Sequence, residues 1–423
     1  MASIATDGVK VASVPSAELV VKAPTASSAV TAVGKKKVRK ASRGRRRGKK
    51  RQGVPDEILQ NAALNKAIKV LPSNYEFEIH KTIWKVNEAQ AKCVALQFPE
   101  GLQMFACVIG DIIVEFSTAE STLILADVTY GACCVDDFSA KAAGADFLVH
   151  YGHSCLVPIA KTSIKSMYVF VSIGIDILHL VECIAMTFED KGTQLSIQGT
   201  IQFAAAVAGA AKGLRKKGYT DIVIPQAKPL SKGETLGCTA PKIEAGRKLI
   251  FVADGRFHME AAMIANPDAT VYQYDPFNKR LTIEGYEHER MKSVRRKAIE
   301  RAAGATHWGI ILGTLGRQGN TELLERIESA VKAKGKTAFV LLLSEIFPHK
   351  LALFKNVGAW VQVACPRLSL DWGTAFESAP LLNAYEAHVA LKMTDWREVY
   401  PMDYYMKGSG PWTNYFDSKS STS

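Results

Sequence analysis

"STLILADVTYGACCVDD" (residues 121–137) runs from an apolar, β-rich segment into a turn of small residues that holds two adjacent cysteines. Open α/β sheets bind their ligands at the carboxyl ends of the strands, where such turns lie. Free cysteines are often buried simply as small apolar side chains. A pair of them in a loop at a strand end is nevertheless a candidate functional site.

Around this segment, short β-rich runs alternate with helical stretches from about Pro55 onward. "KCVALQF" (92–98) precedes the helical pattern of residues 100–116, and "THWGIILG" (306–313) precedes the helical pattern of residues 321–335. Strands that alternate with helices in this way are typical of βαβ units. We therefore predict an α/β protein with mainly parallel sheets.

Three cysteines recur at the ends of predicted strands, at intervals that suggest an internal repeat. Cys133, Cys238 and Cys365 are separated by 105 and 127 residues, each about the length of one small α/β domain. Divergent triplication is the simplest interpretation, and chance recurrence stays open as the alternative. The predicted division is a tail of residues 1–54 and three α/β domains at residues 55–160, 161–283 and 284–423.

The net charge of +12 comes from one short segment. Residues 35–51 contain twelve Lys and Arg and no acid, which leaves 53 − 12 = 41 basic residues against 41 acidic ones. The rest of the chain is formally neutral, so nucleic acid is an unlikely partner except through the basic run. We predict a solvated, disordered tail, with a nuclear-import signal or a ribosome contact as the alternative.

Nothing in the sequence predicts export or a membrane span. The first 34 residues carry Asp7 and Glu18 and lack a charged start followed by a compact apolar run. The most apolar window contains Asp176, His179 and Glu182, which argues against a transmembrane helix. We expect a cytoplasmic protein whose eight cysteines are reduced thiols.

Spacing alone leaves several functions open for the three cysteines. A disulfide is disfavoured by the compartment, and a structural zinc site usually has ligands in tight local pairs, which are missing here. A single nucleophilic cysteine would leave the other two unexplained. Three thiolates without a fourth suit a [4Fe–4S] cluster with one open iron.

Seven motifs, in order along the chain, resemble the diphthamide-synthesis family: "LQFPEGLQ", "DVTYGACCVDD", "VHYGHSCLVP", "LGCTAP", "DGRFHMEA", "ILGTLGRQGN" and "ACPRLSLDWG". The resemblance extends from about residue 55 to "GPWTN" near the C-terminus. It implies three related α/β domains around a central [4Fe–4S] cluster held by Cys133, Cys238 and Cys365. The motif register favours Cys133 over its neighbour Cys134, and the complete set of three implies a catalytic subunit.

The resemblance also implies an activity. Members transfer the 3-amino-3-carboxypropyl group of S-adenosylmethionine to C2 of a histidine imidazole in translation elongation factor 2, by a radical route. The implied partners are a paralogous second subunit in a heterodimer and a small metal-binding protein that donates electrons.

Two residues near the predicted cluster are candidates to hold S-adenosylmethionine. Arg367 follows Cys365 by two residues, and Gln318 lies in "GTLGRQGN", which follows a predicted strand. A guanidinium or amide can grip a carboxylate, although helix capping or an ordinary ion pair is an equal alternative. His153 and His258 are more simply interpreted as structural histidines. Two other functions remain open: a non-catalytic scaffold or ribosome-associated binding subunit, and a zinc-dependent α/β enzyme.

Overall fold

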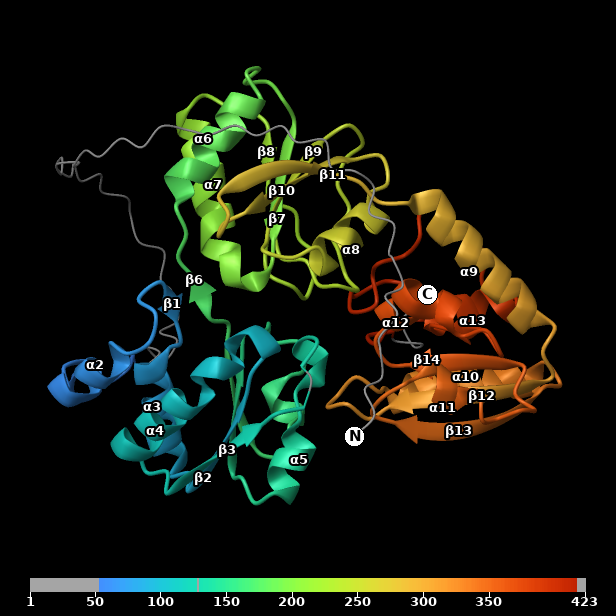
Figure 1. The fold of residues 1–423 in the computed structure, drawn as a ribbon, viewed down its shortest axis with the longest axis horizontal. Coiled ribbons are helices and arrows are strands. Elements are labelled where there is room, and N and C mark those ends of the chain that lie inside the picture. Colours follow the sequence, from blue (N-terminus) through green and yellow to red (C-terminus); the bar gives the residue numbers. More distant parts are fainter. Residues whose placement is uncertain (1–52, 128, 417–423) are drawn as a thin grey trace, which may run out of the picture. The chain divides into compact units, whose positions relative to one another are not determined.

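The structure is a computed structural model that describes residues 53–127 and 129–416 (Figure 1). The predicted basic tail, residues 1–54, lies outside the described residues except for Gly53 and Val54.

The described chain divides into two compact units. The first, here the N-terminal unit, contains the described part of residues 53–129 together with residues 137–171. The second, here the larger unit, contains residues 130–136 and 172–416, and therefore all of the predicted site residues. The predicted boundaries of three domains stay a prediction.

The N-terminal unit is built on a four-stranded sheet in the order β3-β2-β4-β5, in which every pair is parallel. Its core includes the stacked rings of Phe98 and Tyr151, whose centroids are 4.3 Å apart. The elements of this unit are α1 (Asp56–Leu59), α2 (Ala62–Ile68), β1 (Tyr75–Glu76), α3 (Ile79–Ala89), β2 (Cys93–Gln97), η1 (Glu100–Phe105), α4 (Ala106–Phe116), β3 (Ser121–Leu125), α5 (Asp137–Ala142), β4 (Phe147–Tyr151), η3 (Ile159–Lys161) and β5 (Lys165–Val169).

The larger unit contains two sheets. The first has five strands in the order β11-β10-β9-β7-β8, all parallel except the antiparallel pair β10–β11. Its elements, with the cysteine turn η2, are η2 (Ala132–Cys134), β6 (Ser172–Ile173), α6 (Ile177–Thr187), β7 (Leu195–Gly199), η4 (Ile201–Phe203), α7 (Ala204–Lys216), β8 (Ile222–Val223), β9 (Lys248–Val252), α8 (Phe257–Ala265), β10 (Thr270–Asp275) and β11 (Arg280–Glu284).

The second sheet of the larger unit has four parallel strands in the order β13-β12-β14-β15. The prediction of an α/β fold with mainly parallel sheets is confirmed. The elements of this part are α9 (His288–Ala303), β12 (His307–Gly313), α10 (Thr321–Ala333), β13 (Thr337–Leu343), α11 (Pro348–Leu351), β14 (Ala359–Val363), α12 (Arg367–Trp372), η5 (Gly373–Ala375), β15 (Leu381–Leu382) and α13 (Ala384–Ala390).

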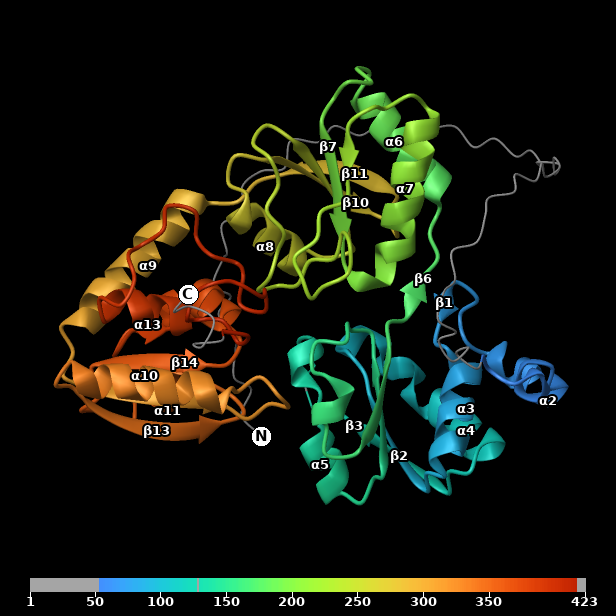
Figure 2. The same ribbon diagram turned by 180° about the vertical axis from the view of Figure 1, so that it is seen from behind.

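Helices α6 and α7 lie beside one flank of the five-stranded sheet, and α8 lies beside the other (Figure 2). Glycines make the α6–α7 contact possible. A Cβ atom at Gly209 would lie 2.7 Å from Ile177, and one at Gly213 would lie 2.8 Å from Val181, so a larger residue at either position would force these side chains to shift. Among the described residues, no helix combines the length and the apolar character that crossing a membrane requires.

Candidate functional site

The turn that carries Cys133 and Cys134 is held by the loop between β12 and α10. The Arg317 amide donates to the Cys133 carbonyl at 2.9 Å, and the Gln318 side-chain amide donates to the Cys134 sulfur at 3.2 Å. Gly316 adopts a φ of 55°, and a Cβ atom there would lie 2.4 Å from the Cys134 carbonyl carbon. The loop can lie this close to the turn because residue 316 is glycine.

Cys238 lies in the long connection between β8 and β9, against the C-terminal segment. The Tyr404 amide donates to the Cys238 carbonyl at 3.4 Å. The neighbouring Thr239 accepts from the Tyr405 amide through its hydroxyl at 3.0 Å and forms a β-bridge with Asp403. Backbone pairing therefore positions this buried cysteine beside residues 403–405.

Cys365 lies in the short turn between β14 and α12. Its carbonyl accepts from the Leu368 amide at 3.1 Å and from the Gln362 side-chain amide at 2.8 Å. The Gln362 side chain also donates to the Ser369 hydroxyl at 3.1 Å. A short strand-to-helix turn thus fixes the third cysteine.

The three predicted cysteines lie close enough together to influence one another electrostatically. The pKa of Cys133 is raised by a hydrogen bond with Cys134, by burial, and by negative charge at Cys134, Cys365 and Cys238. Burial, followed by charge at Cys365, raises the pKa of Cys238 to about 12, and burial raises that of Cys365 to about 11. With pKa values raised in this way, these thiols are protonated at neutral pH.

Tyr405 borders all three of these thiols. Its ring is 8% exposed, and burial followed by negative charge at Cys133, Cys238 and Cys365 raises the pKa of its hydroxyl. No sequence motif pointed to Tyr405. It lies 40 residues beyond Cys365, in a stretch with no strand-end motif, so its place depends on backbone pairing with the Cys238 loop.

Cys134 has a different environment from Cys133. It is 1% exposed, and hydrogen bonds from Cys133, then from Gly131 and Gln318, lower its pKa to about 7. Its negative charge contributes to the raised pKa of Cys365, so it too borders the site. The sulfur of Cys134 is occupied by donors from its own turn and from Gln318.

Arg367 joins the Cys365 turn to the Cys238 loop and to α8. Its Nη1 donates to the Gly237 carbonyl at 3.4 Å and to the Phe257 carbonyl at 2.5 Å. Its guanidinium lies over the Phe257 ring, 4.4 Å from the centroid. Its positive charge also lowers the pKa values of Cys238 and Cys365, against the larger effect of burial.

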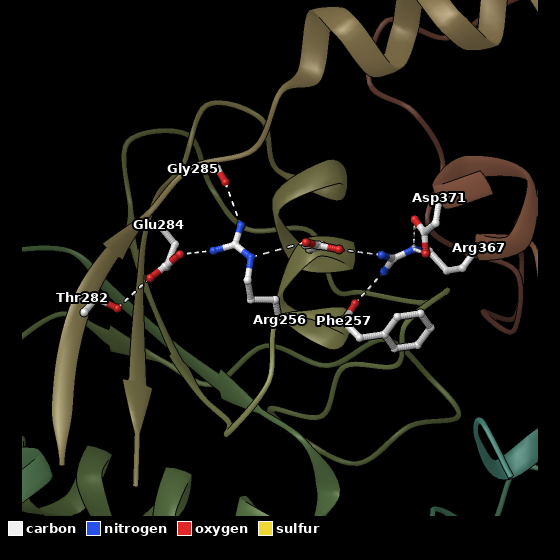
Figure 3. Close-up of polar contacts among 8 residues, drawn as sticks. Arg256, Phe257, Thr282, Glu284, Gly285, Arg367 and Asp371 are labelled. Carbon is white, nitrogen blue, oxygen red and sulfur yellow. Dashed lines mark hydrogen bonds and ion pairs between the residues drawn. The ribbon is translucent and has the colours of Figure 1, made fainter. Parts of the chain in front are cut away.

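Two carboxylates complete the environment of Arg367 (Figure 3). Nη2 donates to Glu260 at 2.6 Å, and Nε donates to Asp371 at 2.9 Å. The Arg367 side chain is only 3% exposed. Glu260 also pairs with Arg256 at 3.5 Å, and Arg256 in turn pairs with Glu284 on β11. Alternating charges therefore connect the five-stranded sheet with the turn of Cys365.

Comparison with known proteins identifies the family. Residues 98–401, more than half of the chain, match the family model described as "Putative diphthamide synthesis protein". The chain belongs to the diphthamide synthesis family. It is 54% identical over 371 residues to 2-(3-amino-3-carboxypropyl)histidine synthase subunit 1 of Homo sapiens, covering 87% of this chain and 84% of that one. It is 52% identical over 374 residues to the protein of the same name from Dictyostelium discoideum, covering 86% and 78%.

A solved structure of the diphthamide synthesis family has the same fold. Dph2 from Pyrococcus horikoshii, crystallised with a 4Fe-4S cluster, superposes with a TM-score of 0.65 at 26% identity, over 79% of this chain and 95% of that chain. The predicted resemblance to the family is confirmed.

The thiols present here are compatible with a cluster like that of the diphthamide synthesis relative. Cysteine thiolates are the ligands that iron–sulfur clusters take. The hydrogen bond with Cys134, burial and the charge of the neighbouring cysteines all raise the pKa of Cys133, and the positive iron ions of a cluster would favour its thiolate. Among residues 53–127 and 129–416, no three His, Cys, Asp or Glu side chains lie close enough to hold a single metal ion. A [4Fe–4S] cluster does not need such a group, because its thiolates bind different irons.

The other predicted residues fall in two places. Gln318 and Arg367 both border the cysteine loops, where their side chains bind Cys134 and the two carboxylates described above. His258 opens α8 beside Arg367, and desolvation followed by the Arg367 charge lowers its pKa to about 4. His153 belongs to the N-terminal unit, where its ring lies 5.3 Å from that of His150.

Replacing Arg367 tests how far its planar geometry matters. We expect Arg367→Lys to lower the free energy of unfolding by about 1–3 kcal/mol, because a single ammonium cannot satisfy Glu260, Asp371 and two backbone carbonyls together. Urea unfolding measures this change. The control is Arg256→Lys, at a side chain that is 45% exposed, for which we expect less than about 1 kcal/mol. If the two variants lost equal amounts of unfolding free energy, the buried Arg367 guanidinium would have no special structural role.

Proposed function

We propose that this chain is the cluster-bearing subunit of an enzyme that transfers the 3-amino-3-carboxypropyl group of S-adenosylmethionine to C2 of a histidine imidazole in translation elongation factor 2. The observation that carries the proposal is the convergence of Cys133, Cys238 and Cys365 beside Tyr405 in one compact unit. Relatives more than 50% identical are named for the synthesis of this modified histidine, which supports the same reaction here.

Cys133, Cys238 and Cys365 would hold a [4Fe–4S] cluster, and three cysteines would leave one of its four irons without a cysteine ligand. When bound, the cluster supplies the electron for reductive cleavage of the sulfonium. The transfer would release methylthioadenosine, and the 3-amino-3-carboxypropyl radical would add to C2 of the imidazole. Loss of the C2 proton and return of the one electron used in the cleavage would then restore the aromatic ring. The chain itself must orient the sulfonium so that the correct carbon–sulfur bond breaks.

Gln318 and Arg367 remain the proposed contacts of S-adenosylmethionine. Both lie at the cysteine loops, and the Arg367 charge acts on Cys238 and Cys365 alike. The donors of Arg367 already face Glu260 and Asp371. A bound amino-acid carboxylate would therefore have to replace one of these two carboxylates.

The proposed assembly is a heterodimer with a paralogous second subunit. The relatives are each named as a subunit 1, which implies that they act beside another subunit. A small metal-binding protein is the proposed electron donor, and the proposed location is the cytoplasm.

An anaerobic assay with the protein substrate tests the proposal. The full chain, co-expressed with its paralogous subunit and reduced with dithionite, should release methylthioadenosine from S-adenosylmethionine. Mass spectrometry should show one added 3-amino-3-carboxypropyl group on elongation factor 2. Cys107→Ala is the control, because this cysteine is exposed in the N-terminal unit and should leave turnover unchanged. A protein that binds zinc instead of iron, or that binds iron and leaves S-adenosylmethionine intact, would refute the proposal.

A further inference from the structure

Strand β13 is an unusually apolar sheet edge. It is the end strand of the order β13-β12-β14-β15 and pairs only with β12 among the described strands. Its seven residues, "TAFVLLL", contain neither a charge nor a proline. One side of this strand therefore presents a row of backbone donors and acceptors that no described strand takes up.

Large apolar side chains are exposed on both faces of this strand. Phe339 is 38% exposed, Val340 37% and Leu342 60%, although α10 contacts the same strand. Just beyond α11, Leu353 is 74% exposed, and Phe354 stacks on Phe339 with the ring centroids 5.8 Å apart. These five residues form the β13 patch, and exposed apolar side chains gathered around one strand are typical of a protein–protein contact.

The other sheet edges in the larger unit lack these properties. β11 carries Arg280 and Glu284, and β8 and β15 are only two residues long. Charge and shortness are the ordinary devices that keep an edge strand from pairing with another chain. β13 has neither, which indicates that its edge is covered in the working protein.

We propose that the β13 patch is the docking surface for the partner subunit, whose own edge strand extends the four-stranded sheet. This inference rests on the proposed function, in which the chain works as one subunit of a pair. The relatives' designation as subunit 1 requires a surface for a second chain. A paralogous chain would carry the equivalent strand, so two such edges can pair antiparallel about a pseudo-two-fold axis.

Charge placed in the patch tests this proposal. The full chain carrying Leu342→Lys is co-expressed with the paralogous subunit, and the heterodimer is measured by size exclusion with light scattering. We expect the dissociation constant to rise about tenfold or more, because the lysine would be buried against an apolar partner. Leu178→Lys is the matched control, since Leu178 is 65% exposed on α6 of the same unit, and the heterodimer should persist.

Hydrogen exchange of the wild-type chain gives a second measurement that needs no variant. Amides of residues 337–343 should exchange more slowly in the heterodimer than in the isolated chain. Unchanged exchange there, or an unchanged dissociation constant for Leu342→Lys, overturns the proposal. A homodimer that Leu342→Lys disrupts while the heterodimer survives also overturns it, because the occupant is then a second copy. Both measurements report assembly without S-adenosylmethionine, so an assembled but inactive complex would contradict only the proposed function.

Discussion

Alanine at Cys133, Cys238 or Cys365 should each remove most of the iron from anaerobically reconstituted protein and abolish cleavage of S-adenosylmethionine. Each substitution removes one of the three proposed ligands, and the neighbouring thiol whose charge acts on Cys133 and Cys365 is that of Cys134. The measurements are an iron and sulfide count and the electron paramagnetic resonance spectrum of the reduced protein. Retention of a normal cluster in any one of the three variants would contradict the ligand assignment.

Cys134 gives the sharpest comparison. Its sulfur accepts from the Gln318 side chain, so Cys134→Ala leaves a buried amide without that acceptor, at a cost of about 1–3 kcal/mol in unfolding free energy. We expect Cys134→Ala to keep the cluster, because the Cys134 sulfur already accepts from the Gln318 side chain and the motif register favours Cys133 as the ligand. If Cys134→Ala lost the cluster and Cys133→Ala kept it, Cys134 would be the ligand in place of Cys133.

The sequence could predict the class of the fold because its strands are short apolar runs. "KCVALQF" and "THWGIILG" became β2 and β12, and the helical pattern at residues 321–335 became α10. Strand β7 was missed because its pattern is not apolar. It carries two polar residues, Ser196 and Gln198, that are fully buried. The Gln198 side-chain oxygen accepts a hydrogen bond from the Thr235 hydroxyl, which lies 37 residues further along the chain.

The sequence predicted several residues of the site but not the side chains that these residues contact. Arg367 was a candidate because it follows Cys365 by two positions, but Glu260 lies 107 residues away on α8. Only the folded backbone brings such a pair together. Local motifs can therefore identify the cysteines and their neighbours, whereas the side chains that position them depend on the tertiary structure.

Helix α9 shows the same limit in the core. Its sequence, "HERMKSVRRKAIERAA", is highly charged, and only Met291, Arg295, Ile299 and Ala302 are buried. Arg295 is fully buried because Glu386 on α13 meets it with two bonds of 2.6 Å, to Nε and Nη2. A charged residue on the inner face of a helix has no signature in the local pattern, since its partner lies 91 residues away.

Breaking this pair should be among the most destabilising single changes in the chain. We expect Arg295→Met to lower the unfolding free energy by roughly 3–5 kcal/mol, because the Glu386 carboxylate would stay buried without its counter-charge. Asn383 and Tyr400 still donate to that carboxylate, at 3.0 and 2.8 Å, but neither carries a positive charge. Urea unfolding followed by circular dichroism measures the loss.

The neighbouring residue provides the control. Arg296 is 47% exposed and pairs with Glu398 at 2.6 Å, so Arg296→Met should cost less than about 1 kcal/mol. Adding Glu386→Leu to Arg295→Met should recover part of the stability, because the second change removes the unpaired charge. The alternative outcome is that Glu386→Leu lowers the unfolding free energy by the same amount in Arg295→Met as in the wild type. The two side chains would then be energetically independent. The unpaired carboxylate would then not be the cause of the loss, and the hydrogen bond from Arg295 to the Leu381 carbonyl would be the remaining explanation.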